Sequence, residues 1–385
     1  MNDYLKVYDV TLKTRGPVYI GSGSSLSKKE YIYMERARKI VVPNLKKMYM
    51  DLRKMHKEHS YEQYMLEESR IGLYDWIRNE GIDLAYIDKW QDYTLNCEDS
   101  FIDKRKLEVM TFIKDAYGKP YVPGSSLKGM LRTVILAEDL VNNESKYNKV
   151  RREVEESSRQ YSKNKKSYLS RETRNLEVEC YNLLDRDEKR NNAVNDIMSG
   201  IKVSDSEPLD TNDIILCQKI ERHIDGRDKS LNILRECIKP NIEIKFAITI
   251  DTSLCDIDDS AIMKAIELFA TKYYVNFSRK YQNTFKPLKK SVWLGGGVGF
   301  TSKTVINQLC KENGLRVTSK ILETLFPDKN FGNNKARHRH DEDVRLGVSP
   351  HILKVTKYNG NYYQFGECVF NIKPRIEEFS ADADK

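Results

Sequence analysis

The chain has 385 residues, enough for two domains, and 65 Lys and Arg against 57 Asp and Glu give a net charge of +8, which permits a nucleic-acid partner without requiring one. No stretch approaches the length of a membrane span and no signal segment follows Met1, so we expect a cytoplasmic protein. The seven cysteines are scattered and contain no C-x-x-C pair, which argues against a disulfide framework or a zinc ribbon and predicts reduced core residues.

The first unit is predicted to mix strands and helices. Residues 5–12 alternate as a strand does, and a strand pair is expected at 31–34 and 39–42. Helical segments follow over 43–70, and a short strand-like run at 197–205 closes the unit. This order is typical of an α+β fold built on antiparallel sheets.

The first candidate site is a turn followed by a helix, YVPGSSLKGMLR at residues 121–132. Ser125 or Ser126 can cap the first free N–H groups, and the apolar spacing after them predicts a buried helix. Lys128 and Arg132 are four residues apart and therefore share a helix face, where they could hold successive phosphates beside the positive end of the helix dipole. The alternative is an ordinary helix start with two solvated cations.

A highly charged tract without Gly or Pro runs from residue 142 to 192. Its first half has few large apolar residues. We therefore expect an exposed helical excursion or a partly mobile arm, outside the core.

A polar turn after the tract places the predicted domain boundary near Asp210. The second unit is expected to contain strands at 214–221 and 241–251, a helix at 260–274, and the glycine-rich run WLGGGVGFTSKT at 293–304.

The glycine-rich run does not match the common nucleotide loops. Phe300 stands where both the P-loop and the dinucleotide pattern require a glycine. What remains is a backbone that can approach another chain closely, with Lys303 beside it. A tight hairpin turn is the other interpretation.

Four motifs in order resemble the RAMP proteins of CRISPR effector complexes: P-x-x-I-G-x-G at 17–23, P-G-S-S-L-K-G-x-x-R at 123–132, V-S-D at 203–205 and G-G-G-x-G at 295–299. The resemblance spans nearly the whole chain, and the second motif is its most specific part. The length, the charged insertion and a strand at 349–354 resemble the Csm-type (type III-A) subunit that ends the backbone filament near the crRNA 3′ end.

The resemblance implies two ferredoxin-like, RRM-related domains, at 1–210 with the 142–192 insertion and at 211–385 with the glycine-rich loop. It also implies a grip on guide RNA that depends on backbone shape and charge instead of base sequence. The residues that would carry it are Ser22, Ser24, Gly124, Ser125, Ser126, Lys128, Arg132, Gly295, Gly296, Gly297 and Lys303.

The same resemblance argues against catalysis. Related subunits that cut target RNA carry an Asp after the first glycine turn, whereas residues 22–30 here contain no Asp and one late acid, Glu30. The alternative is a metal-independent, crRNA-processing endoribonuclease of the same superfamily, in which His56 or His59 would move the proton. Asp205 is expected to orient backbone.

We expect no metal or cofactor. The run HRHDED at 338–343, which includes His338 and His340, offers imidazoles and carboxylates but lies in what looks like a mobile polar loop.

The function that the resemblance implies is a non-catalytic RNA-binding and assembly subunit of a type III-A ribonucleoprotein. It would cap the filament, support crRNA maturation and serve antiviral defence. The implied partners are crRNA, target RNA through the guide duplex, the adjacent backbone RAMP subunit, the small helical Csm subunit and host nucleases, without a membrane. A free-standing RRM module is a third hypothesis, but the RRM signature is not visible.

Overall fold

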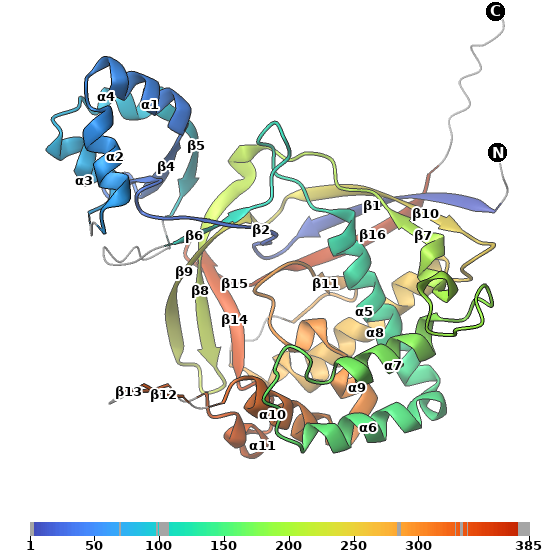
Figure 1. The fold of residues 1–385 in the computed structure, drawn as a ribbon. Coiled ribbons are helices and arrows are strands. Elements are labelled where there is room, and N and C mark those ends of the chain that lie inside the picture. The colour runs from blue at the N-terminus through green and yellow to red at the C-terminus, as the bar shows by residue number, and fades with distance from the viewer. Residues whose placement is uncertain are drawn as a thin grey trace, which may run out of the picture.

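The computed structural model describes residues 4–68, 71–97, 99, 108–282, 286–327, 329–331, 334–336 and 338–375. Two large sheets organise these residues (Figure 1). The five-stranded sheet has the order β11 (Ser291–Trp293), β16 (Glu367–Pro374), β1 (Leu5–Thr14), β10 (Glu243–Asp251) and β7 (Ile201–Val203). Strand β1 lies at its centre because its alternating apolar residues are buried and it pairs on both sides, with Val10 opposite Phe246 and Ile372.

The six-stranded sheet has the order β15 (Asn361–Gln364), β14 (Ile352–Tyr358), β8 (Ile214–His223), β9 (Asp228–Ile238), β6 (Val109–Phe112) and β2 (Gly21–Leu26). Its neighbours pair antiparallel except β6 and β9, which run parallel. Strand β2 is an edge strand, and residues 21–25 on it are exposed. The predicted α+β class on mainly antiparallel sheets is confirmed.

Strands from both sides of residue 210 contribute to each large sheet. Strand β1 pairs with β10 and β16, and β6 pairs with β9. The division at 210 remains a prediction about sequence organisation, because neither sheet belongs to one side of it.

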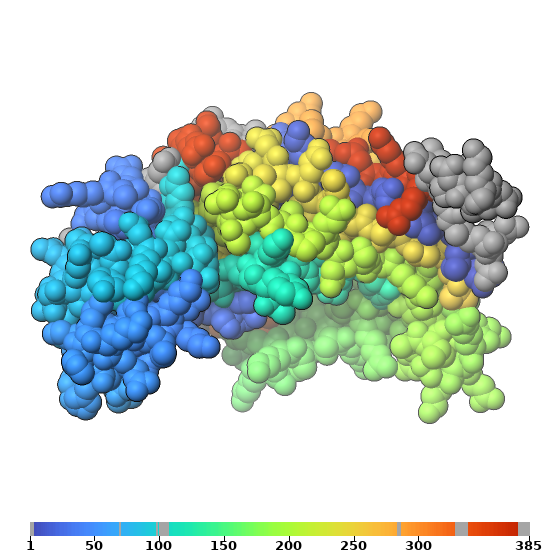
Figure 2. Space-filling view, turned by 90° about the horizontal axis from the view of Figure 1, so that it is seen from above, coloured from blue at the N-terminus to red at the C-terminus, as the bar shows by residue number. Residues whose placement is uncertain are grey.

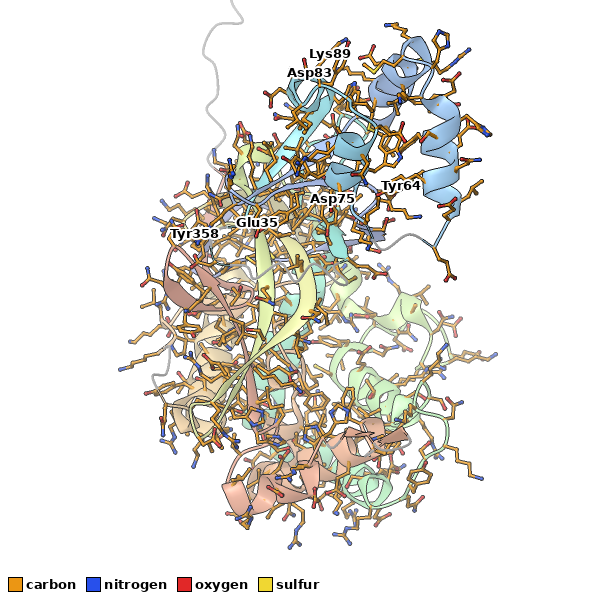
Figure 3. The ribbon with its side chains drawn as sticks, turned by 90° about the vertical axis from the view of Figure 1, so that its left-hand side faces the viewer. Glu35, Tyr64, Asp75, Asp83, Lys89 and Tyr358 are labelled. Atoms are coloured by element: carbon orange, nitrogen blue, oxygen red, sulfur yellow. The ribbon has the colours of Figure 1, made fainter. Side chains whose placement is uncertain are left out.

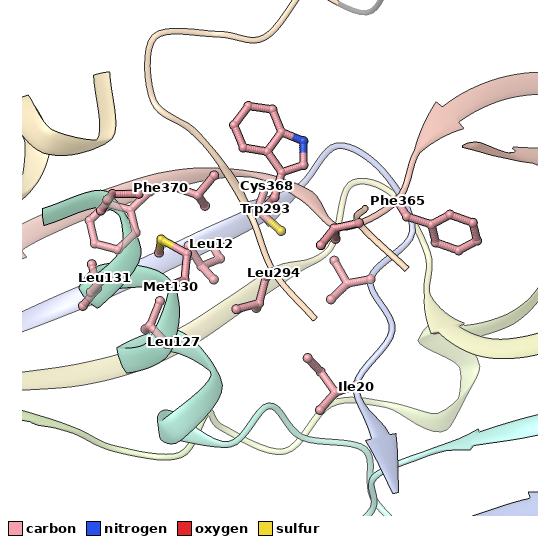
Figure 4. Close-up of a cluster of buried hydrophobic side chains, with 14 of the residues drawn as sticks. Leu12, Ile20, Leu127, Met130, Leu131, Trp293, Leu294, Phe365, Cys368 and Phe370 are labelled. Atoms are coloured by element: carbon pink, nitrogen blue, oxygen red, sulfur yellow. The ribbon is translucent and has the colours of Figure 1, made fainter. Parts of the chain in front are cut away.

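Helices pack against the five-stranded sheet to form the main core. Helix α5 (Gly124–Asn142) contacts α8 (Asp259–Asn276), and its Leu127, Met130 and Leu131 lie with Leu12 and Phe370 in one buried cluster (Figure 4). The remaining helices outside the module described below are α6 (Asn148–Ser158), α7 (Ser170–Tyr181), α9 (Ile306–Cys310), α10 (Gly314–Leu325) and α11 (Asp343–Leu346), and a short pair, β12 (Lys329–Phe331) and β13 (Asn334–Ala336), follows α10.

Most predicted elements are confirmed within one or two residues, including the helix that becomes α8, where Asp258 caps the start by accepting from Ala261 N–H. All seven cysteines are free and buried, as predicted. No helix in the described part of the chain is long and apolar enough to cross a membrane.

The charged tract does form helices, but the prediction that it stays outside the core is wrong. Its few apolar residues are spaced so that they face inward from α6, α7 and the short 3-10 turn Glu144–Tyr147. Tyr147, Val150, Val154, Leu176 and Tyr181 are all buried in the main core cluster. A few apolar residues are enough to pack these helices against the core, because within each helix they lie on the face that points inward.

A separate module is inserted between β2 and β6. It consists of a three-stranded sheet, β3 (Ile32–Met34), β4 (Lys39–Pro43) and β5 (Gln91–Asn96), and four helices, α1 (Leu45–Lys54), α2 (Glu58–Leu66), α3 (Leu73–Asn79) and α4 (Ala85–Trp90). It has a hydrophobic cluster of its own and projects from one end of the molecule (blue to cyan, Figures 1 and 2). Tyr64, Asp75, Asp83 and Lys89 all come from this module (Figure 3).

One buried carboxylate attaches the module to the six-stranded sheet. Glu236 on β9 is fully buried and accepts from Tyr93 Oη of β5 at 2.5 Å and from Phe112 N–H of β6 at 2.8 Å. Lys114 Nζ supplies the compensating charge at 3.0 Å and also lies over the Tyr93 ring. A buried carboxylate with this many partners fixes the position of the strands that it joins.

Candidate nucleic-acid interface

The start of α5 is capped from another part of the chain. The helix begins at Gly124, and Gly124 N–H donates to Asp205 Oδ1 at 2.7 Å. A Cβ at this glycine would lie 2.4 Å from the carbonyl oxygens of Val203 and Ser204, so only glycine allows this approach. The predicted cap by Ser125 or Ser126 is therefore wrong, whereas the prediction that Asp205 orients backbone is confirmed.

The two cations of α5 share one face, as predicted, but that face points into the protein. Lys128 Nζ donates to Ile201 O of β7 at 2.7 Å, and burial lowers the pKa of its ammonium. Arg132 pairs with Asp196 at 2.7 Å and Glu177 at 3.3 Å. Burial opposes its charge, yet the hydrogen bond that it donates to Asp196 raises the guanidinium pKa.

The glycine-rich turn approaches the other half of the sequence. Gly296 N–H donates to Tyr19 O at 2.7 Å, in the segment between β1 and β2. Gly295 has φ +83°, and a Cβ there would lie 2.2 Å from the same carbonyl oxygen. The expected close approach to the first unit is thus present. The turn is not a hairpin, because β11 before it pairs with β16 and not with the next strand.

The turn and the first turns of α5 enclose a groove of about 310 Å³. It brings together four of the predicted site residues, Ser125, Ser126, Gly295 and Lys303, with Gly129, Phe269 and Trp293 also lining it. Figure 4 shows Trp293 and Leu294 at this junction. Burial lowers the pKa of Lys303, and no carboxylate pairs with it in the described part of the chain.

A basic cluster lies on the other side of the same turn. Arg235 of β9 stacks near the Tyr19 ring, and its Nη1 lies 2.4 Å from where a Cβ of Gly297 would stand. Its Nε and Nη1 are buried without a hydrogen-bond partner among the described residues. Such orphan donors are costly unless a ligand or water satisfies them.

Two lysines complete the cluster. Lys354 of β14 is paired with Glu221 at 2.5 Å. Lys219 lies at a register shift of β8 and has no ion pair within the described ranges; burial, followed by Lys354 and Arg235, lowers its pKa to about 8. The cluster of Lys219, Arg235 and Lys354 therefore carries more positive charge than Glu221 can balance.

Sequence reasoning missed this cluster. Its three cations come from strands β8, β9 and β14, far apart along the chain, and each looks like a normal polar position in an alternating strand. One available signal was that Lys219 and Glu221 share a strand face, two residues apart, in a run otherwise rich in apolar residues.

Ser22 and Ser24 lie on the exposed edge strand β2. Ser22 Oγ is 2.6 Å from Thr111 Oγ1, which also donates to Ser24 O at 3.0 Å. These contacts stabilise a local bulge in the pairing of β2 with β6. Gly21, next to this bulge, lies close to the Tyr19 hydroxyl. The two serines are accessible but lie on a different element from the groove.

The histidine alternatives separate into two groups. His56 and His59 are exposed on the module, in the turn after α1 and on α2, and neither imidazole pairs with a carboxylate among the described residues. The expectation of a mobile loop at 333–345 is wrong for residues 338–345, where His340 and Asp343 are buried in a 3-10 turn and α11. Residues 333 and 337 lie outside the described residues.

Known proteins resemble this chain along almost its whole length. The chain is similar to proteins described as "CRISPR system Cms protein Csm5" from Mycobacterium tuberculosis (strain CDC 1551 / Oshkosh), 28% identical over 97% of this chain and 99% of the relative, and from Streptococcus thermophilus, 25% identical over 97% and 98%.

Two solved structures share the fold. One is a chain of a cryo-EM Csm–crRNA–target RNA ternary complex in a type III-A CRISPR-Cas system, with a TM-score of 0.61 and 18% identity over 94% of this chain and 100% of that chain. The other is the crystal structure of T. onnurineus Csm5, with a TM-score of 0.56 and 18% identity over 93% and 99%. The RAMP superfamily model matches residues 11–302, and the chain therefore belongs to the RAMP superfamily.

Proposed function

We propose that this chain is a non-catalytic crRNA-binding and assembly subunit of a type III-A CRISPR ribonucleoprotein, which caps the filament at the crRNA 3′ end and supports crRNA maturation. One observation carries the proposal. The glycine-rich turn has unbalanced cations on both sides, Lys303 in the groove and Lys219 with Arg235 on the sheet. A polyanion crossing this turn would supply the missing counter-charge.

The groove and the basic cluster would each bind a different phosphate of an RNA backbone. Lys303 would contact one phosphate beside the hydroxyls of Ser125 and Ser126, and Lys219 with Arg235 would contact another. These contacting groups would be held in position by Gly124, Lys128, Arg132 and Gly295–Gly297. Ser22 and Ser24 would add contacts where RNA leaves along the β2 edge.

The names of the relatives support the assembly role. The similar chains are called Csm5, and one solved neighbour is part of a complex with crRNA and target RNA. The partners we propose are therefore crRNA, the neighbouring backbone RAMP subunit and the small helical subunit. Target RNA would be reached through the guide duplex, and host nucleases would trim the guide.

The experiment is affinity purification of the tagged protein from its native cells, with sequencing of bound RNA and identification of bound proteins. We expect repeat-derived guides of defined length together with other RAMP subunits. The Lys219→Ala, Lys303→Ala double variant should recover the proteins but lose much of the RNA, whereas Lys163→Ala, at an exposed position of the charged tract, should behave as wild type. Recovery of the protein alone, or with unrelated RNA, contradicts the proposal.

The nuclease alternative is tested on the same preparation. Incubation of purified protein with crRNA precursor should leave the RNA intact. Cleavage that is lost in His56→Ala or His59→Ala would replace the assembly role with an endoribonuclease.

A further inference from the structure

A second cluster of polar side chains, two imidazoles and a carboxylate, lies next to the start of β14, apart from the groove. His340 Nδ1 lies 3.1 Å from Asp343 Oδ2, and His351 Nδ1 lies 2.5 Å from Asp343 Oδ1. Ser349 Oγ donates to Asp343 Oδ2 at 2.6 Å. One nitrogen from each imidazole and one carboxylate oxygen all lie within 4.8 Å of one another.

This cluster joins three consecutive segments of the chain. His340 is in the 3-10 turn His340–Glu342, Asp343 begins α11, and His351 directly precedes β14. The backbone carbonyl of His340 also accepts from Ser319 Oγ of α10 at 2.7 Å. An interaction that holds the three side chains together therefore also holds residues 340–346 between α10 and the six-stranded sheet.

The charge of Asp343 needs compensation. Its side chain is fully buried, and its ion pairs in the described part of the chain are those with the two imidazoles. The side chains of His340 and His351 are themselves only 8% and 7% exposed. The donors that stabilise this buried carboxylate are the two imidazoles and Ser349 Oγ, and a bound cation would supply the opposite charge directly.

We propose that His340, Asp343 and His351 bind one divalent transition-metal ion, with Zn²⁺ as the best match. Two imidazole nitrogens and one carboxylate oxygen form a donor set that suits zinc and is poor for Mg²⁺ or Ca²⁺, which prefer oxygen ligands. The fourth position would be filled by Ser349 Oγ or by water. The ion would serve the fold, by closing residues 340–346 onto β14.

The proton balance of this step is simple. In the hydrogen-bonded cluster each imidazole presents its Nδ1 proton to Asp343. Binding through Nδ1 requires a neutral ring with its proton on Nε2, so a neutral imidazole changes tautomer and an imidazolium releases one proton to solvent. Asp343 exchanges two N–H···O bonds for one bond to the metal.

Movements of up to about 1.5 Å admit the ion, because the two imidazole nitrogens, which lie within 4.8 Å of each other, must also approach. Ligand atoms around tetrahedral zinc are roughly 3.3 Å apart, given bonds of about 2.0 to 2.1 Å. The carboxylate–imidazole distances of 3.1 Å and 2.5 Å would therefore lengthen by less than about 1 Å. Around this set, His223 lies with its ring 5.5 Å from that of His351, next to the proposed ligands.

The test uses RNA-free, full-length protein, so its result does not depend on the proposed RNA function. Metal content is measured by mass spectrometry after purification and again after chelation and reloading with Zn²⁺. We expect one zinc per chain and a thermal midpoint that falls on chelation and returns with Zn²⁺. The matched control is His59→Gln, which removes an exposed imidazole on α2 and should keep full metal content.

His351→Gln keeps a polar side chain but removes a ligand, and it should bind zinc at least tenfold more weakly, with no change of thermal midpoint on chelation. Co²⁺ loading of the wild-type chain gives a readout that needs no variant: tetrahedral coordination should produce visible absorption that Zn²⁺ displaces. A wild-type chain with only trace metal, no Co²⁺ spectrum and the same thermal midpoint with and without Zn²⁺ would show that the cluster is a hydrogen-bonded network alone.

Discussion

Two regions of the molecule present cations near a glycine turn, and they use them differently. At the start of α5, Arg132 is paired with Asp196 and Glu177, and Lys128 donates to Ile201 O. Around the glycine-rich turn, Lys219 and Lys303 have no such partners in the described ranges. The paired cations hold parts of the fold together, whereas the unpaired ones are the groups that we propose to contact RNA. Charge alone therefore does not identify a phosphate site.

The largest effect should come from the turn that separates the groove from the basic cluster. Gly295→Ala would place a Cβ 2.2 Å from Tyr19 O at φ +83° and should lower the free energy of unfolding by about 3 kcal/mol. Gly360→Ala is the matched control, because Gly360 has φ +74° but a Cβ there would have no neighbour within 4 Å. Its loss should be about 1 kcal/mol. Urea unfolding measures both, and equal losses would mean that the close approach is not important.

The next effect distinguishes the two cation sets directly. Lys219→Ala with Lys303→Ala should weaken binding of a guide-length single-stranded RNA about a hundredfold at low salt, because two charged contacts are lost. Lys128→Ala with Arg132→Ala should change it less than about threefold. Fluorescence anisotropy at several salt concentrations measures both, and the first double variant should also show a shallower salt dependence.

The opposite ranking would overturn the distinction. If the Lys128, Arg132 variant loses RNA while it unfolds like wild type, the cradle predicted from the sequence at α5 is the RNA site. A change in both variants with no change in salt slope would mean that the affinity does not come from phosphate contacts.

Local sequence patterns predicted the elements well because they depend on neighbours along the chain. Strand β1 and helix α8 follow from periodicity, and the approach of the glycine run to another segment follows from its lack of side chains. The partners of Lys128 and Arg132 could not be predicted, since they lie at 177–201. The basic cluster was missed because strand register brings its members together. The sequence did mark the run 338–343, which contains His340 and Asp343, but His351 joins them only through the fold of residues 343–351.

A smaller effect tests the structural role of the paired set. Arg132→Gln removes the ion pairs to partly buried Asp196 and exposed Glu177, and the loss of the counter-charge at Asp196 should lower the free energy of unfolding by about 1 to 2 kcal/mol. Arg227→Gln, on an exposed pair with Asp225, should leave the free energy of unfolding nearly unchanged, because solvent screens this pair. Chemical denaturation compares the two, and equal costs would mean that Arg132 is not a fold-holding cation.

The smallest effect is a pH dependence of RNA binding. Burial and neighbouring cations lower the pKa of Lys219 to about 8, so its ammonium is charged at pH 7 and mostly neutral at pH 9. RNA favours the charged form, and affinity should therefore fall by about fivefold between pH 7.5 and 9, which is within the limit of tenfold per pH unit for one proton. Lys219→Arg should bind at pH 7.5 like wild type and show a smaller slope, because a guanidinium stays charged throughout this range. The slope that remains would report Lys303, whose pKa is also lowered by burial. An unchanged slope in Lys219→Arg would remove Lys219 from the phosphate contacts and leave Lys303 as the titrating group at the turn.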